Sequence, residues 1–262
     1  MRAAPPPPYS PATVDGAEPA TDAKIRQSIA SLQRSPAERA RDAYRHPLET
    51  LEFFGLKDTM TVVELSPGGG WYSTLLAPVL RDEGKLVIAG RDPNSNSDAR
   101  ALLTRFENMS HTFDRVAWVV VTHDAPQLGP PESADMVLTF RNLHNWVNGG
   151  STDAIFGAAF AVLKHGGVLG LTDHRANPGA SADPRVVGAT GYIPEEAAVQ
   201  LVEKVGFRLA GKSEVNANPK DTKDYPKGVW TLPPSYDLGA SDHSKYEAIG
   251  ESDRMTLKFV KP

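Results

Sequence analysis

Residues 62–72 read VVELSPGGGWY, and this stretch determines the fold. An apolar, β-branched run ends in the acidic Glu64, three glycines follow at Gly68–Gly70, and helix-forming sequence begins directly afterwards. Glycine adopts positive φ angles and lets the backbone approach a ligand without an intervening Cβ atom. A strand, a glycine-rich turn and a helix in succession are typical of a nucleotide-binding site. A tight strand-to-helix turn without a ligand is the alternative interpretation.

The sequence around this turn alternates between short apolar runs and helical segments. Strands are predicted at 61–65, 85–90, 116–121, 134–140, 168–172, 207–213 and 255–260, and helices at 72–80, 98–109, 153–163 and 194–205. Such alternation predicts an α/β, Rossmann-like fold whose mostly parallel sheet is covered by helices on both faces. The nearly continuous apolar character of the runs fits strands that are buried on both sides.

The chain divides into three predicted parts. Residues 1–21 are rich in proline and alanine and predict a flexible tail. Residues 22–58 predict a helical cover, in which Ser35 and Glu38 have the spacing of a capping box and Gly55 ends the second helix. The main domain is expected at 59–262. Within it, 216–253 has no helical period, and because a loop of this length is unusual in a compact domain, we expect an ordered lid over the site.

Composition excludes several kinds of chemistry and partner. The 262 residues include no cysteine, which rules out disulfides, thiolate nucleophiles and cysteine-bound zinc. The net charge of −4 offers no basic field for nucleic acid or anionic lipid, and no apolar run reaches the roughly 18–20 residues that span a bilayer. We expect a cytoplasmic protein; a periplasmic one is the alternative, if the proline-rich start follows a removed export signal.

The glycine-rich turn resembles motif I of the class I S-adenosylmethionine-dependent methyltransferases, an acidic residue followed by Gly-x-Gly-x-Gly. Ser66 stands in place of the first glycine, while Gly68 and Gly70 hold the second and third places. Segments after the second to fifth predicted strands resemble later motifs of this family in the right order. Residues 41–47, 140–146, 173–175 and 250–254 resemble, more closely, a little-characterised bacterial group of predicted methyltransferases. The resemblance implies the class I methyltransferase fold, with a seven-stranded sheet, and S-adenosylmethionine as cofactor.

The same resemblance implies a set of cofactor-binding residues. Glu64 would position the methionine amino end, Asp92 would bind the ribose hydroxyls, and Asp124 would lie near the adenine. An ordinary turn residue before Pro93 remains the alternative for Asp92, and a plain loop residue the alternative for Asp124. The complete expected set is Glu64, Ser66, Pro67, Gly68, Gly70, Asp92, Asp124, Arg141 and Asn142.

Two histidines are candidate general bases. His144 follows the fourth predicted strand and His174 the fifth, and ligands of open α/β sheets bind beyond the carboxyl ends of the strands. A neutral imidazole accepts a proton near pH 7, as an OH or NH acceptor would require. A structural histidine bonded to loop backbone is the alternative for each. Adjacent strand residues point to opposite faces, so we expect Asp173 to pair with a group other than His174.

Further polar and aromatic residues are candidates for binding the acceptor. Arg141 and Arg175 carry forked donors that suit a carboxylate or a phosphate, with loop salt bridges as the alternative. Core packing is the alternative for the tryptophans, and a solvated helix face for the polar residues 41–46. The expected acceptor-binding set is Tyr44, His46, Trp146, Arg175 and Trp230.

The sequence thus predicts methyl transfer from S-adenosylmethionine to a small-molecule acceptor by in-line displacement. Two alternatives keep the fold: an S-adenosylmethionine-binding protein with a different reaction, and a binding protein without catalysis, because a fold does not fix a reaction. We expect no metal, since no helical His-x-x-x-His spacing joins His144, His174 or His243. The oligomeric state is left open.

Overall fold

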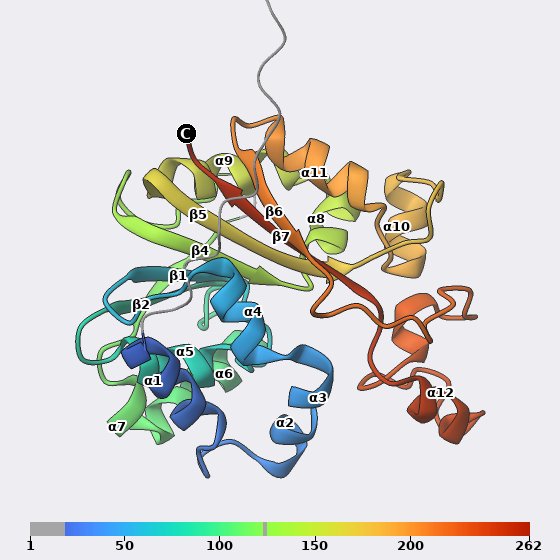
Figure 1. Cartoon of the computed structure of the whole chain (residues 1–262), viewed down its shortest axis with the longest axis horizontal. Coiled ribbons are helices and arrows are strands. Elements are labelled where there is room, and N and C mark those ends of the chain that lie inside the picture. Colours follow the sequence, from blue (N-terminus) through green and yellow to red (C-terminus); the bar gives the residue numbers. More distant parts are fainter. Residues whose placement is uncertain (1–18, 123–124) are drawn as a thin grey trace, which may run out of the picture.

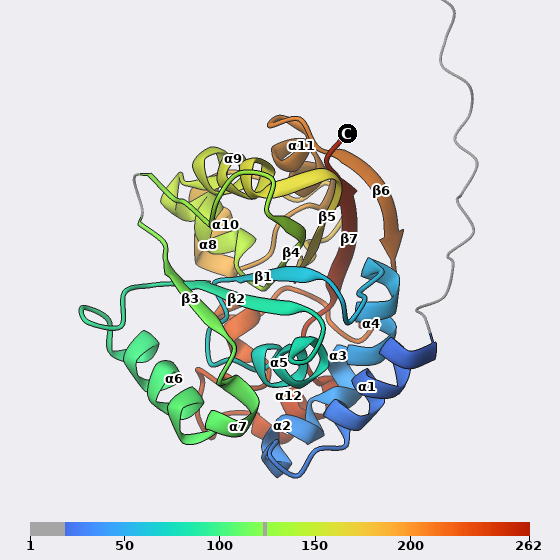
Figure 2. The same cartoon turned by 90° about the vertical axis from the view of Figure 1, so that its left-hand side faces the viewer.

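The computed structural model describes residues 19–122 and 125–262, and within them seven strands form one sheet. The strand order is β3-β2-β1-β4-β5-β7-β6, in which β7 runs antiparallel to both of its neighbours and the other pairs are parallel (Figure 1; β3 is labelled in Figure 2). The strands are β1 (Thr61–Leu65), β2 (Lys85–Gly90), β3 (Ala117–Val120), β4 (Ala134–Phe140), β5 (Leu163–His174), β6 (Arg208–Ser213) and β7 (Arg254–Val260). The predicted mostly parallel, seven-stranded sheet is confirmed.

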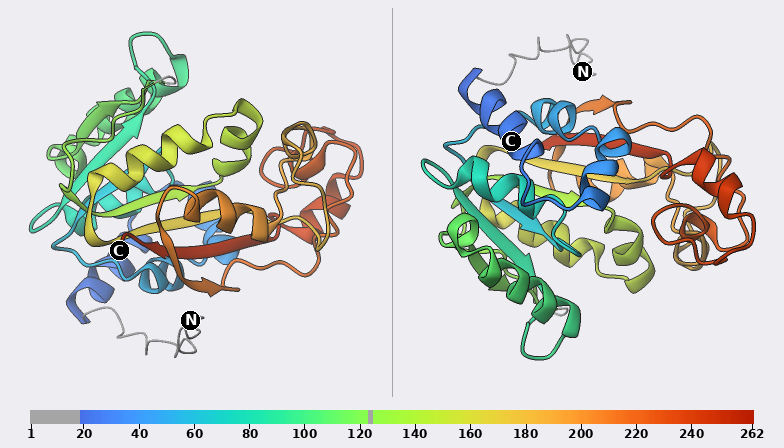
Figure 3. Two further views of the ribbon diagram at one scale, coloured as in Figure 1. Left: turned by 90° about the horizontal axis from the view of Figure 1, so that it is seen from above. Right: turned by 90° about the horizontal axis from the view of Figure 1, so that it is seen from below.

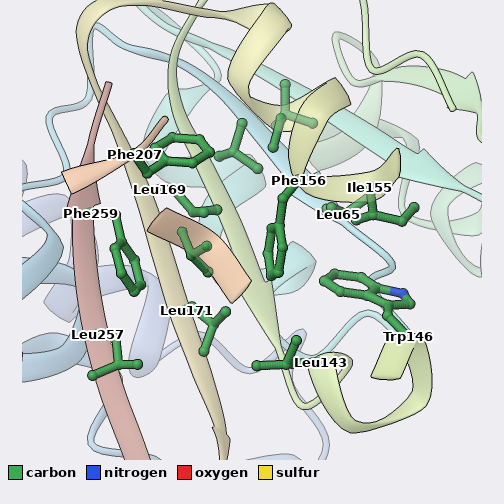
Figure 4. Packing of buried hydrophobic residues seen from close by; sticks show 14 of the residues in the cluster. Leu65, Leu143, Trp146, Ile155, Phe156, Leu169, Leu171, Phe207, Leu257 and Phe259 are labelled. Atoms are coloured by element: carbon green, nitrogen blue, oxygen red, sulfur yellow. The ribbon is translucent and has the colours of Figure 1, made fainter. Parts of the chain in front are cut away.

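Helices cover both faces of the sheet, as Figure 2 shows. One layer comprises α1 (Pro19–Ile29), α4 (Pro47–Phe54), α5 (Ser73–Leu80), α6 (Ser97–Asn108) and α7 (Ser110–Phe113). The other comprises α8 (Leu143–Gly149), α9 (Thr152–Val162), α10 (Pro184–Thr190) and α11 (Glu195–Glu203). Alternate strand residues serve the two layers: Val62 packs under the first and Val63 under the second. Figure 4 shows the second cluster, with Phe156 of α9 facing Leu169 and Leu171 of β5.

The front of the chain forms short helices as expected. Between α1 and α4 lie α2 (Pro36–Ala40) and α3 (Asp42–Arg45). The capping box at the start of α2 is present: the backbone N–H of Glu38 donates to Ser35 Oγ, and that of Ser35 donates to the Glu38 carboxylate. Gly55 ends α4 in the left-handed conformation (φ 81°). The predicted tail falls largely on residues 1–18, which lie outside the described residues.

Residues 216–253 lie beyond one end of the strands, in the orange and red part of Figure 3. They contain the 3-10 turn η1 (Gly228–Thr231) and α12 (His243–Ile249), neither of which the sequence pattern predicted. Buried side chains hold this segment to the domain: Asn216 donates to Thr50 and Thr256, and Tyr192 donates to Asp221. Within the described residues, no helix is long and apolar enough to cross a membrane.

Candidate functional site

The glycine-rich turn after β1 has a backbone that few side chains tolerate. Ser66, Gly68 and Gly70 all have positive φ angles, of 55°, 57° and 77°. For a non-glycine residue such as Ser66 this conformation costs on the order of 1–3 kcal/mol. Asn142, just after the neighbouring strand β4, stabilises the turn. Its Nδ2 donates to the carbonyl of Ser66 (2.9 Å) and to that of Leu65 (3.3 Å). These two hydrogen bonds give Asn142 a structural role beside its expected role in cofactor binding.

Glu64 is enclosed at the end of β1. Its side chain accepts a hydrogen bond from Ser73 Oγ (2.6 Å). Burial disfavours the charged carboxylate and raises the pKa of Glu64 to about 8, although the bond from Ser73 opposes this shift. Glu64 is therefore mostly protonated at neutral pH.

Two cavities meet at the glycine-rich turn. The larger, of about 1100 Å³, extends past Gly90 and Arg91 at the end of β2 toward Trp118 and Thr122. The smaller, of about 310 Å³, lies between the turn, the front helices and the end of β4. Ser66, Pro67, Gly68, Gly69 and Asn142 line both. A ligand with two unlike ends therefore has room on both sides of the turn.

The carboxylates expected near the nucleoside lie in different places. Asp92 is not among the residues lining the larger cavity, and its Oδ1 accepts the backbone N–H of Asn94 (2.8 Å), as in an ordinary turn. Asp98, in the first turn of α6, does line the cavity. Asp124 lies outside the described residues.

His144 is paired with a buried carboxylate. At the start of α8, its Nδ1 lies 2.8 Å from Asp173 Oδ1, and its backbone N–H donates to Asp173 Oδ2 (3.0 Å). Because Asp173 is the acceptor, the proton of the neutral ring lies on Nδ1 and the lone pair lies on Nε2. No hydrogen bond to Nε2 occurs within the described residues. As expected, Asp173 pairs with a group other than its neighbour's ring.

His174 has both ring nitrogens occupied. Arg141 Nε donates to Nε2 (3.3 Å), which leaves the proton on Nδ1, 2.5 Å from Ser252 Oγ. Burial, followed by the charge of Arg141, lowers the pKa of His174 well below its usual value. The imidazole is therefore neutral and has no lone pair to offer a substrate.

The expected acceptor-binding residues do not form one group. Trp230 lies edge-on to His144, with ring centroids 6.1 Å apart. Trp146 lines the larger cavity and packs on Phe156, as core packing predicts. Tyr44 is 40% exposed, and no polar partner reaches Nδ1 of His46 within the described residues.

Arg175 is already bound by carboxylates. Its donors reach Asp253, Glu195 and Glu214 at 2.6–3.3 Å, and the bond to Glu214 first, followed by those to Asp253, raises its pKa. The prediction that Arg175 clamps a substrate is not supported by this geometry, and the alternative of a loop salt bridge describes it.

Sequence reasoning did not identify a second polar group. Glu251 is 4% exposed and contacts Arg41, Arg45 and Arg254. The segments 41–47 and 250–254 both resemble the bacterial group of predicted methyltransferases, and this resemblance was the one sequence signal for this polar group. The contact between the two segments, across about 210 residues of sequence, could not be derived from it.

One group of side chains within the described residues has the proximity of a metal site: candidate ligand atoms of His144, Asp173 and His174 lie within 4.8 Å of one another. The hydrogen bonds argue against that use. The positively charged Arg141 donates to His174 Nε2, so it occupies the lone pair that a metal ion would need and would repel the ion. Asp173 already accepts from His144 Nδ1 and two backbone N–H groups.

Comparison with known proteins agrees with the fold. No protein-family model and no curated protein matches the chain. Among solved structures, an S-adenosylmethionine-dependent methyltransferase from Aquifex aeolicus is 15% identical, with a TM-score of 0.59 over 92% of this chain and 98% of that one. The [4+2]-cyclase SpnF is 14% identical, with a TM-score of 0.56 over 93% of both chains. At these identities the likeness establishes the class I methyltransferase fold.

Proposed function

We propose that this protein binds S-adenosylmethionine at the glycine-rich turn and transfers its methyl group to a small-molecule acceptor. The observation that carries the proposal is the pairing of His144 with Asp173, beside the residues of α8 that line the cofactor cavity. A buried carboxylate that fixes the tautomer of a histidine is the arrangement of a general base.

The two cavities fit the proposed cofactor. The nucleoside would lie in the larger one, with Asp98 a candidate for the ribose hydroxyls in place of Asp92. The methionine end would lie in the smaller one, with its ammonium group near Glu64. Cβ atoms added at Gly68 or Gly69 would meet no heavy atom within 4 Å, so open space adjoins the turn where the ligand would pass.

The proposed reaction depends on the alignment of the acceptor with the methyl group and on removal of the acceptor's proton. S-adenosylmethionine supplies an electrophilic methyl group bonded to a sulfonium. The acceptor's oxygen or nitrogen forms the bond to the methyl carbon, and the electrons of the broken S–C bond return to sulfur. His144 Nε2 takes the acceptor's proton, and Asp173 stabilises the imidazolium. Holding the acceptor in line supplies much of the rate.

We propose that an acceptor reaches His144 when the segment 216–253 moves. His144 is 4% exposed, and Trp230 from this segment lies against it. We propose that this segment acts as a lid, which opens to admit the acceptor and closes to exclude water.

Calorimetry with S-adenosylmethionine and S-adenosylhomocysteine tests the cofactor site. We expect both to bind, and we expect Gly68→Val to weaken binding at least 100-fold because its side chain occupies the ligand's space. Gly166→Val is the control: Gly166 also has a positive φ (77°) and open surroundings, but lies at the start of β5 away from both cavities. Absence of binding by the intact protein would refute the proposal; binding without turnover of any acceptor would favour the non-catalytic alternative.

Glu64 gives a second expected result. Because burial raises its pKa to about 8, an ammonium group beside it should drive the carboxyl to ionise, so that cofactor binding at pH 7 releases most of one proton. Calorimetry in buffers of different ionisation enthalpy measures this release. Glu64→Gln should abolish it; an unchanged release in that variant would show that Glu64 is not the group that ionises.

The same pKa predicts how stability depends on pH. The folded pKa is raised above the unfolded value of about 4.5, so Glu64 leaves stability intact below pH 4.5 and reduces it as pH rises toward 8. The loss is on the order of a few kcal/mol. Urea unfolding at pH 5 and pH 8 should show a smaller difference for Glu64→Gln than for the natural protein.

A further inference from the structure

We propose that the methyl acceptor carries an anionic group, a carboxylate or a phosphate, which the arginine cluster Arg41, Arg45, Arg141 and Arg254 binds at the small cavity. The proposal rests on the proposed function, because it places the acceptor beside a cofactor at the glycine-rich turn. It names the substrate class that the sequence left open.

The cluster gathers side chains from both ends of the chain around one carboxylate. Glu251 lies 2.5 Å from Arg41 Nε, 3.4 Å from Arg45 Nε and 3.0 Å from Arg254 Nη1. Arg141, at the end of β4, lies close enough for its charge to act on Arg45. Arg41, Arg45 and Arg141 all line the small cavity.

The positive charge of the cluster is not balanced. Four guanidinium groups face Glu251, while Glu64 in the same cavity is mostly protonated and Glu38 is paired with Arg105 (2.6 Å). The charge of Asp173 also acts on Arg141, but Asp173 already accepts from His144 and two backbone N–H groups. An excess of buried positive charge is costly unless a counter-charge is present.

The buried arginines have too little negative charge beside them. Burial, only partly offset by Glu251, lowers the pKa of Arg45 to about 9, and likewise that of Arg141 to about 10. A bound anion would reverse both shifts.

Several donors of the cluster lack a partner. Nη2 of Arg41 and Nε of Arg254 are buried with no hydrogen bond within the described residues. Arg45 and Arg141 donate only through Nε. Both Nη atoms of each of these arginines therefore have no acceptor among the residues that the structure describes. Unused planar donors of this kind match the oxygens of a carboxylate or a phosphate.

The cofactor would not supply the missing charge. S-adenosylmethionine has one carboxylate, one ammonium and one sulfonium, so its net charge near neutrality is +1. Its ammonium would be balanced by Glu64, which ionises when the cofactor binds, and its carboxylate could pair with one arginine, but the sulfonium adds a positive charge to the same region. An anionic acceptor would balance the arginines that remain.

The position of the cluster also suits the reaction. Arg141 contacts His174, whose ring centroid lies 5.1 Å from that of His144. An acceptor held by its anionic group on the cluster would therefore extend toward the proposed base. Trp71, Tyr72 and Phe140 line the same cavity, so its wall is partly apolar beside the arginines and suits the carbon body of such an acceptor.

Calorimetry on the intact protein saturated with S-adenosylhomocysteine tests the proposal. The probes are benzoate, phenyl phosphate, inorganic phosphate and the neutral benzamide. We expect benzoate or phenyl phosphate to bind at least tenfold more tightly than benzamide, and Arg41→Gln to weaken that binding at least tenfold. Arg41 is chosen because its side chain is 23% exposed and Glu251 keeps two other partners, so folding should survive.

The control is Arg39→Gln, two residues away on α2, where the side chain donates to the carbonyl of Arg34 instead of facing the cluster. Equal binding of benzamide and benzoate, or unchanged binding in Arg41→Gln, would overturn the proposal. So would binding of inorganic phosphate alone, since the cluster would then hold a free ion. If the natural protein does not bind S-adenosylhomocysteine, the proposed function is wrong. Titration of the same anions into the protein without cofactor would then still test the arginine cluster.

Discussion

Replacing His144 by glutamine is expected to lower the rate of methyl transfer about 10²–10⁴-fold at saturating cofactor and acceptor. Glutamine keeps a polar side chain of similar length but cannot accept the acceptor's proton. Asp173→Asn should produce a loss of similar size, because an amide no longer fixes the tautomer that leaves a lone pair on His144 Nε2. Formation of S-adenosylhomocysteine with a panel of hydroxylated aromatic acids measures the rate.

Two comparisons make this expectation specific. S-adenosylmethionine affinity should change little in either variant, since neither His144 nor Asp173 lines a cavity at the glycine-rich turn. His165→Gln, whose side chain is 73% exposed, should behave as the natural protein does. A fully active His144→Gln variant would exclude the proposed base.

His174 should respond differently. Its nitrogens are occupied by Arg141 and Ser252, so we regard it as a positioning residue. His174→Asn should raise the KM for an anionic acceptor more than it lowers kcat, because it releases Arg141 from its place. The opposite pattern would return His174 to the catalytic role that the sequence allowed.

Glu251→Gln is expected to destabilise the fold by about 3–5 kcal/mol, the usual consequence of removing one partner from a buried ion pair. Glu214→Gln is the matched control: Glu214 also pairs with an arginine, but its side chain is 68% exposed, and a loss of about 1 kcal/mol or less is expected. Urea unfolding at pH 7 measures both. Equal effects of the two substitutions would show that the buried arginines do not depend on Glu251.

Lowering the pH should also destabilise the fold through Glu251. Burial alone would raise the pKa of Glu251, but Arg254, Arg45 and Arg41 outweigh it and lower the pKa to about 2. Since the folded pKa lies below the unfolded value, the stabilisation is complete above about pH 4.5 and is lost as the pH falls toward 2. Glu251→Gln should remove this part of the acid dependence.

The sequence predicted the sheet well, because burial on both faces leaves a local signature in each strand. Strands β1, β2 and β4 begin and end where the apolar runs do. The helices α8 and α10 were missed, since short helices that pack on other helices carry little period of their own. At the site, the glycine-rich turn and His144 followed from local sequence and the family resemblance.

The rest of the site depends on contacts between distant segments. Nothing in the sequence around Asp173 indicates that its carboxylate reaches His144, 29 residues earlier. Hydrogen-bond partners likewise distinguish Arg141, which keeps free donors, from Arg175, whose donors are taken by three acids. The local sequence around the two arginines does not reveal this difference, because it depends on partners that are distant in the chain.

The position of β7 between β5 and β6 affects how the protein is made. Among the described strands, β6 pairs only with β7, and Glu251 lies just ahead of β7, separated from it by Ser252 and Asp253. While the ribosome is still translating, Arg41, Arg45 and Arg141 therefore emerge long before Glu251, the carboxylate that they face, and β6 has no strand to pair with. A nascent chain in this state exposes positive charge and a free strand, both of which chaperones and proteases can recognise. Once β7 has left the ribosome and paired, it joins β6 to the sheet, and Glu251 reaches the arginines in the same step.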